Sequence, residues 1–180
     1  MPKIYLSPSS KESDSWLIGG NDEFYMNLIV DAMILVFRSN GIDFIRNNPG
    51  NSLSQIISQS NAGNHDLHIA LYSNSSPENM RGILQGPDIY HYATSKEGQK
   101  AAEIIAEKIR SIYPNPELVQ VIPTTILAEL RRTKAPAILV KIAYQDNYDD
   151  AVWVRDNIDS IGRQLAIGTA EYLNVPFKSP

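Results

Sequence analysis

The three histidines could support the widest range of chemistry in this sequence, and no cysteine accompanies them. His65, His68 and His91 are the only histidines among 180 residues, and the absence of cysteine excludes thiolate metal sites and cysteine nucleophiles. If residues 67–72 form a strand, His68 and Tyr72 share one face but lie about 13 Å apart. That separation places His68 too far back to join a site at the end of the strand. His65 precedes the strand and should lie at the opposite end of the sheet, and His91 is harder to place. We interpret all three histidines as structural or surface residues.

Acidic and amide residues late in the chain offer a second kind of site. Glu129, Asp146 and Asn147 could ring one cleft and bind a ligand through hydrogen bonds. An alternative role for Asp146 and Asn147 is to cap a helix predicted from residue 149, since both residue types favour that position. Ser10 has no obvious histidine partner, which argues against a Ser-His-Asp hydrolase.

The elements that must position these residues alternate along the chain. Apolar periodicity, caps and turn residues predict strands at 3–7, 42–46, 67–72, 88–93, 126–130 and 137–142, and helices at 23–40, 52–62, 95–113, 149–156 and 158–173. This alternation indicates one three-layer α/β domain over residues 1–180, with a central, mostly parallel sheet of about six strands flanked by helices. Sites in such sheets lie beyond the carboxyl ends of the strands, here the loops after Leu6, Leu71 and Val140.

Four segments near these loops share their pattern and order with one enzyme family. They are residues 4–10 (IYLSPSS), 23–28 (EFYMNL), 66–74 (DLHIALYSN) and 130–141 (LRRTKAPAILVK), the last followed by Asn147. The chain thereby resembles the zinc-dependent N-acetylmuramoyl-L-alanine amidases. These enzymes cut the bond between the lactyl group of muramic acid and the first residue of the peptidoglycan stem peptide. The resemblance runs from Lys3 to about Leu173, and it implies the amidase fold and a role at the bacterial cell wall.

The resemblance also implies where the family's chemistry would lie. In that family two His and one Glu hold zinc, and a second Glu is the general base for attack by the metal-bound water. Carried over by motif, these positions are Ser10, Glu23, Tyr72 and Lys141. Only Glu23 keeps the family's residue type, because Ser and Tyr are poor neutral zinc ligands and Lys cannot act as a carboxylate base. We therefore assign no catalytic residue and no metal ligand here, and we expect no cofactor.

The same cleft suggests how lost zinc could be compensated. One hypothesis is that the ammonium of Lys141 neutralises Glu23 in place of the metal, with Tyr72 donating a hydrogen bond nearby; the alternative is that Lys141 points to water. Asn74 ends a matched segment and is a candidate ligand contact. Arg131 matches a family Arg, and could contact an acidic or carbonyl group of a ligand or pair with a neighbouring carboxylate.

Composition limits the partners. Apolar residues make up 43% and charged residues 20%, as in ordinary globular proteins. A net charge of −4 and a pI of about 5.3 give no indication of nucleic acid or an anionic membrane as partner. No segment approaches the ~18 apolar residues of a membrane span. The first residues contain no apolar core of a signal peptide, and we leave the location open.

Two functions agree with these observations. The first is a non-catalytic, cell-wall-associated amidase relative, a pseudoenzyme that binds a muropeptide or a protein partner through the old cleft. The alternative is an active peptidoglycan amidase with a rearranged metal site. The chemistry of the four substituted positions favours the first.

Overall fold

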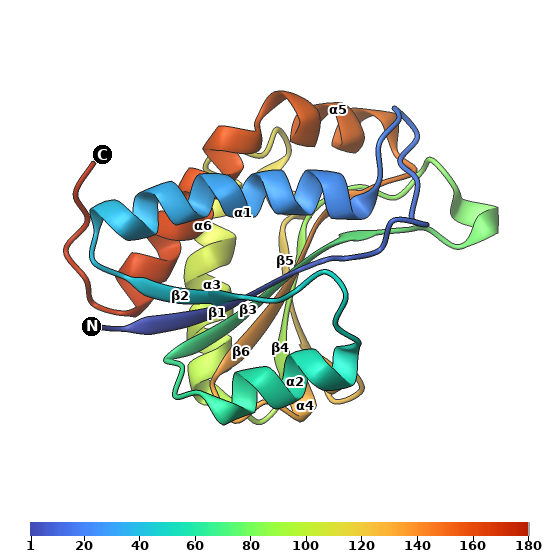
Figure 1. Cartoon of the computed structure of the whole chain (residues 1–180). Helices are drawn as coiled ribbons and strands as arrows, with labels where there is room; N and C mark the ends of the chain where they lie inside the picture. Colours follow the sequence, from blue (N-terminus) through green and yellow to red (C-terminus); the bar gives the residue numbers. More distant parts are fainter. Residues whose placement is uncertain (180) are drawn as a thin grey trace.

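A six-stranded sheet runs through the middle of the molecule, with helices on both of its faces (Figure 1). The computed structural model describes residues 1–179. The strands are β1 (Lys3–Pro8), β2 (Asp43–Arg46), β3 (Leu67–Asn74), β4 (Asp88–Tyr92), β5 (Gln120–Thr124) and β6 (Ala137–Tyr144), in the order β2-β1-β3-β6-β4-β5. All neighbouring pairs are parallel except β4 and β6. The predicted fold class, with a mostly parallel sheet of about six strands, is confirmed.

The helices divide unequally between the two faces. They are α1 (Asp22–Ser39), α2 (Leu53–Ala62), α3 (Lys96–Arg110), α4 (Ala128–Arg131), α5 (Tyr148–Asp156) and α6 (Ile158–Tyr172), with short 3-10 turns at Glu78–Met80 and Pro116–Leu118. Four of them, α1, α3, α5 and α6, cover one face, whereas only α2 and the single turn α4 lie on the other (Figure 1). None of these helices is long and apolar enough to cross a bilayer.

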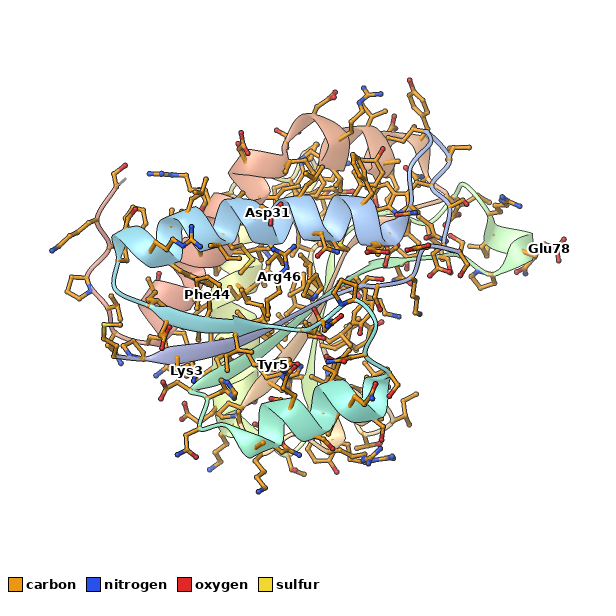
Figure 2. The ribbon with its side chains drawn as sticks, in the orientation of Figure 1. Lys3, Tyr5, Asp31, Phe44, Arg46 and Glu78 are labelled. Carbon is orange, nitrogen blue, oxygen red and sulfur yellow. The ribbon has the colours of Figure 1, made fainter. Side chains whose placement is uncertain are left out.

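Strand alternation sends apolar residues to the thickly covered face and polar residues to the thin one. Ile4 and Leu6 of β1 belong to the large core beneath α1 and α6. Tyr5 points to the opposite face, where its hydroxyl donates to Gln59 of α2 at 2.6 Å (Figure 2). A much smaller apolar cluster lies there, formed by Ala70, Leu130, Ala137 and Leu139. The α2/α4 face therefore has room for a polar site.

Local signals fix the ends of the two helices nearest that site. The side chain of Asn21 accepts a hydrogen bond from Phe24 N and caps α1. Ser52 and Gln55 form a reciprocal capping box at the start of α2. Arg46 of the edge strand β2 forms an ion pair with Asp31 of α1 at 2.6 Å, which adds a contact between this helix and the edge of the sheet (Figure 2).

One part of the predicted element order is wrong. Residues 126–130, predicted as a strand, contain the start of helix α4, and the late strand is instead β5, which was not predicted. Pro123 lies inside β5, and a proline within a segment argues against predicting a strand there. The strand is possible because β5 is at the edge of the sheet, where a missing backbone N–H is tolerated. A helix of one turn is too short to show a 3.6-residue period.

Candidate functional site

A cleft of about 450 Å³ opens at the carboxyl ends of β1, β3 and β6, on the face covered by α2 and α4. This volume is within the range of small-molecule sites. Its polar lining includes Ser10, Lys11, Asp14, Asp22, Asn51, Tyr72, Asn74, Glu129 and Lys141. Its apolar wall consists of Leu53, Ile56, Leu127 and Leu139. The topology thus brings together Ser10 from the loop after β1, Tyr72 of β3 and Lys141 of β6, because the carboxyl ends of these parallel strands meet at one edge.

Asp22, and not Glu23, lines the cleft at the start of α1. Asp22 is 1% exposed, and its carboxylate accepts hydrogen bonds from Ser73 N at 3.1 Å and Trp16 Nε1 at 3.3 Å. Glu23 is partly exposed, and its pKa is raised by burial and by the neighbouring carboxylate of Glu12. The two acids are adjacent in sequence, and nothing in the sequence alone distinguishes which of them turns inward.

Lys141 faces Asp88 rather than Glu23. The two residues are opposite each other in the antiparallel pairing of β4 and β6. Burial lowers the pKa of Lys141, Asp88 opposes that shift, and the charge of Lys11 adds to it. The ion pairs formed within residues 1–179 do not include Lys141 with Glu23. The hypothesis of that compensating pair is therefore wrong, because Glu23 does not turn into the cleft.

Asp88 does not itself line the cleft, but it contacts Asn74, which does. Asn74 Nδ2 donates to Asp88 Oδ2 at 3.2 Å. Burial raises the pKa of Asp88 from 3.8 to about 6, while Lys141 and Asn74 act in the opposite direction. The ammonium of Lys141 also lies 5.4 Å from the centre of the Tyr90 ring. Asn74 thus lines the cleft and at the same time fixes the carboxylate that faces Lys141.

Glu129 is the centre of a buried hydrogen-bond network. It is 3% exposed, accepts a hydrogen bond from the Tyr72 hydroxyl at 2.8 Å, and its Oε1 lies 2.8 Å from His68 Nε2. Burial alone would raise the pKa of Glu129, but the hydrogen bond and charge of His68, with help from Tyr72, hold that pKa below its usual value. The sequence pattern predicted a strand at Glu129 and a remote position for His68. Because α4 folds over the sheet, Glu129 instead bridges His68 and Tyr72.

The network has the order of a hydrolase triad but not its accessibility. Ser60 Oγ lies 2.9 Å from His68 Nδ1, so Ser60, His68 and Glu129 form a continuous chain. Ser60 is 2% exposed and His68 is completely buried, and neither lines the cleft. A nucleophile must reach its substrate, and Ser60 is buried away from the cleft. The hydrogen bonds among Ser60, His68 and Glu129 therefore hold α2 and α4 to the sheet and do not form an active site. His65 and His91 are also buried, at 9% and 4% exposure.

Asp146 and Asn147 anchor a loop rather than line the cleft. The carboxylate of Asp146 accepts from Ser76 N at 2.9 Å and Gly82 N at 2.8 Å. Asn147 is the N-cap of α5 and also donates to Gly82 O at 3.0 Å. Arg131 is exposed on α4 and does not contribute to the cleft lining. Of the five residues predicted to contact a ligand, Asn74 and Glu129 line the cleft.

Comparison with known proteins agrees with this architecture. The sequence profile of the family described as N-acetylmuramoyl-L-alanine amidase matches residues 17–171. The chain belongs to the N-acetylmuramoyl-L-alanine amidase family. A search of the curated proteins finds no match to the sequence.

Solved structures of amidases share the fold. N-acetylmuramoyl-L-alanine amidase AmiC2 of Nostoc punctiforme superposes with a TM-score of 0.82 at 17% identity, covering 96% of this chain and 97% of that one. The N-acetylmuramoyl-L-alanine amidase from Clostridium difficile 630 gives 0.84 at 14% identity, covering 96% and 97%. Cwp6 from Clostridium difficile gives 0.84 at 23% identity; the match covers 96% of this chain and only 29% of that one. At these identities the similarity establishes the fold.

The donor set of the cleft does not fit the zinc that the family resemblance implies. A catalytic zinc site needs three protein ligands and an open position. Within residues 1–179, no group of three or more His, Cys, Asp or Glu side chains is arranged to hold a metal ion. The two buried carboxylates that line the cleft already accept hydrogen bonds from the protein, Asp22 from Trp16 and Ser73, and Glu129 from Tyr72.

Proposed function

We propose that this amidase-family domain is catalytically silent and binds a peptidoglycan fragment through the cleft at the carboxyl ends of β1, β3 and β6. The observation that carries the proposal is the side chains at the motif positions. Ser10, Tyr72 and Lys141 stand where the family resemblance implies two imidazoles and a carboxylate base.

The chemistry of these side chains supports the absence of hydrolysis. Amide cleavage near neutral pH needs an activated water molecule and stabilisation of the developing oxyanion, and a zinc ion supplies both in metallohydrolases. The hydroxyls of Ser10 and Tyr72 are poor zinc ligands. The ammonium of Lys141 donates hydrogen bonds and cannot accept the proton of an attacking water molecule.

The shape and lining of the cleft support binding. Its lining combines apolar side chains, among them Leu53, Ile56 and Leu127, with several polar groups. Small-molecule sites have this composition, with apolar area for affinity and a few placed polar groups for orientation. A concave site of this size suits a fragment of sugar and peptide better than the broad surface of a protein partner.

A working amidase with a rearranged metal site is the second candidate. The observation that favours it is that Glu129 lines the cleft and contacts His68, so an acid and an imidazole lie together. Those two groups are one ligand short of a zinc centre, and they contact each other.

Hydrolysis of the muramoyl-L-alanine bond separates the two candidates. Purified protein would be incubated with peptidoglycan and added zinc, and released stem peptides would be quantified by mass spectrometry beside a zinc amidase of the family. We expect no release above the buffer control, together with measurable binding of soluble muropeptides by calorimetry. Release that requires zinc and is abolished by Glu129→Gln would contradict the proposal and establish the rearranged site.

A further inference from the structure

The two buried carboxylates of the cleft are already used by the protein, whereas several donors that line it remain available. Asp14, the third carboxylate of the lining, is more exposed and lies 4.0 Å from Lys11. The carboxylates of Asp22 and Glu129 accept hydrogen bonds from protein groups. The side chains of Ser10, Asn51 and Lys141 also line the cleft, and each can donate. Across residues 1–179 none of these three side chains has a hydrogen-bond partner, so the cleft offers donors to a ligand rich in acceptors.

Two ammonium groups strengthen this preference. Lys11 lies over the Tyr72 ring, 5.7 Å from its centre, and Lys141 lies over the Tyr90 ring. The carboxylate nearest Lys11 is Asp14 at 4.0 Å, a distance at the outer limit of an ion pair, and both side chains are exposed. Asp88 faces Lys141 from the neighbouring strand but forms no ion pair with it within 4.0 Å. Both ammonium groups therefore keep hydrogen-bonding capacity for a ligand.

We propose that Lys141 and Lys11 bind a ligand carboxylate that lies beside a methyl group, with the methyl group against Leu53, Ile56 and Leu127. This inference rests on the proposed function and names the ligand chemistry of the same cleft. Two parts of peptidoglycan carry that chemistry, namely the lactyl group of muramic acid once its amide bond has been cut, and a terminal D-alanine. The domain would then recognise a carboxylate end rather than the intact amide.

The preference for a carboxylate follows from charge. A hydrogen bond between an ammonium and a carboxylate is about twice as strong as a bond between neutral groups, and a neutral amide or ester offers only a carbonyl oxygen. Loss of one such bond should raise the dissociation constant by roughly tenfold to hundredfold. A matched pair of acid and ester ligands therefore tests the proposal directly.

The experiment is calorimetric titration of the wild-type chain at low salt with three ligands. These are N-acetylmuramic acid, its methyl ester and D-alanyl-D-alanine. We expect at least one of the two acids, N-acetylmuramic acid or D-alanyl-D-alanine, to bind. If N-acetylmuramic acid binds, its dissociation constant should be at least about tenfold smaller than that of its methyl ester. Binding of the dipeptide alone would assign the carboxylate to a terminal D-alanine.

Variants identify the groups responsible. Lys141→Met should abolish the preference for the acid, and Lys11→Met, at a largely exposed position where folding is not at risk, should weaken it. Lys96→Met is the matched control, since Lys96 is an exposed lysine of α3 outside the cleft, and it should leave binding unchanged. Equal binding of acid and ester, or a preference that survives both cleft variants, would overturn the inference. A methyl ester that binds as tightly as the acid still occupies the cleft, so that result overturns this inference and leaves the proposed function standing. If none of these ligands binds and the soluble muropeptides of the preceding experiment do not bind either, both fail.

Discussion

Glu129 joins side chains that lie far apart in the sequence. It links Tyr72 and His68 of β3 to the single turn α4, and through His68 to Ser60 of α2. Removal of one member of a buried polar network leaves its partners without hydrogen bonds in a dry environment, which costs more than the pair contributes when intact. Glu129 therefore has more influence on this face of the sheet than its place on a four-residue helix suggests.

We expect Glu129→Leu to lower the free energy of unfolding by about 3 kcal/mol, because it leaves His68 and Tyr72 unpaired. Tyr72→Phe removes one hydrogen bond and should cost about 1 kcal/mol. Arg131→Leu is the control, on the same helix but exposed, and should change stability by less than about 0.5 kcal/mol. Urea denaturation measures all three, and a cost for Glu129→Leu no larger than that of Arg131→Leu would show that the network does not stabilise the fold.

Asp88 gives the protein a pH dependence of defined sign. Its pKa in the folded state, about 6, lies above the ordinary value of 3.8, so between these values the folded chain binds more protons than the unfolded chain. The contribution of Asp88 to stability is therefore present below about pH 4 and is lost as the pH rises through about 6. The side chain of Asp88 is partly exposed, so solvent screening reduces the effect of its pKa shift on stability. We therefore expect a contribution of about 1 kcal/mol to the free energy of unfolding.

The measurement is the unfolding free energy of wild type and Asp88→Asn at about pH 4 and pH 7. The wild type should lose about 1 kcal/mol relative to the variant over this interval. A difference between the two proteins that does not change with pH would mean that Asp88 titrates as an ordinary exposed carboxyl group.

At the scale of elements, strong local signals were readable from the sequence and tertiary effects were not. The helix from Asp22 has a capping residue, Asn21, and a long apolar stripe, and it was predicted within one residue of its bounds. Strand β5 was missed because its Pro123 is acceptable only at a sheet edge, and edge position is a property of topology. Helix α4 was missed because one turn has no measurable period. As a consequence Glu129 was assigned to the wrong kind of element.

The packing of α6 on α1 depends on a glycine. A Cβ added at Gly162 would lie 2.5 Å from the Cβ of Ala32 and 2.7 Å from the carbonyl oxygen of Ile29, and backbone cannot move aside cheaply. We therefore expect Gly162→Ala to lower the free energy of unfolding by about 1–3 kcal/mol, although alanine is the better helix former. Ser160→Ala, at an exposed position of the same helix, should be neutral or slightly stabilising. Thermal or urea unfolding that showed Gly162→Ala to be stabilising would contradict the close approach of the two helices.

At the scale of the whole molecule, the order of strands explains how far the site could be predicted. Parallel strands bring the loops after β1, β3 and β6 to one edge, so the alternation of strands and helices in the sequence was enough to predict which loops border the site. The family resemblance then indicated Ser10, Tyr72 and Lys141 near those loops, and all three line the cleft. The inward turn of Asp22 in place of Glu23 depends on hydrogen bonds from Trp16 and Ser73, which sequence spacing does not reveal. The sheet thus defines the location of the cleft, and packing decides which side chains enter it.

The most direct test of a silent amidase cleft is its zinc stoichiometry. The protein would be incubated with excess zinc, desalted and subjected to elemental analysis, beside a zinc amidase of the family treated in the same way. The side chains that line the cleft predict a zinc content well below one ion per chain, because Asp22 and Glu129 already accept hydrogen bonds from the protein. A content near one zinc ion per chain that falls in Glu129→Gln would contradict this account and would place a metal centre in the cleft.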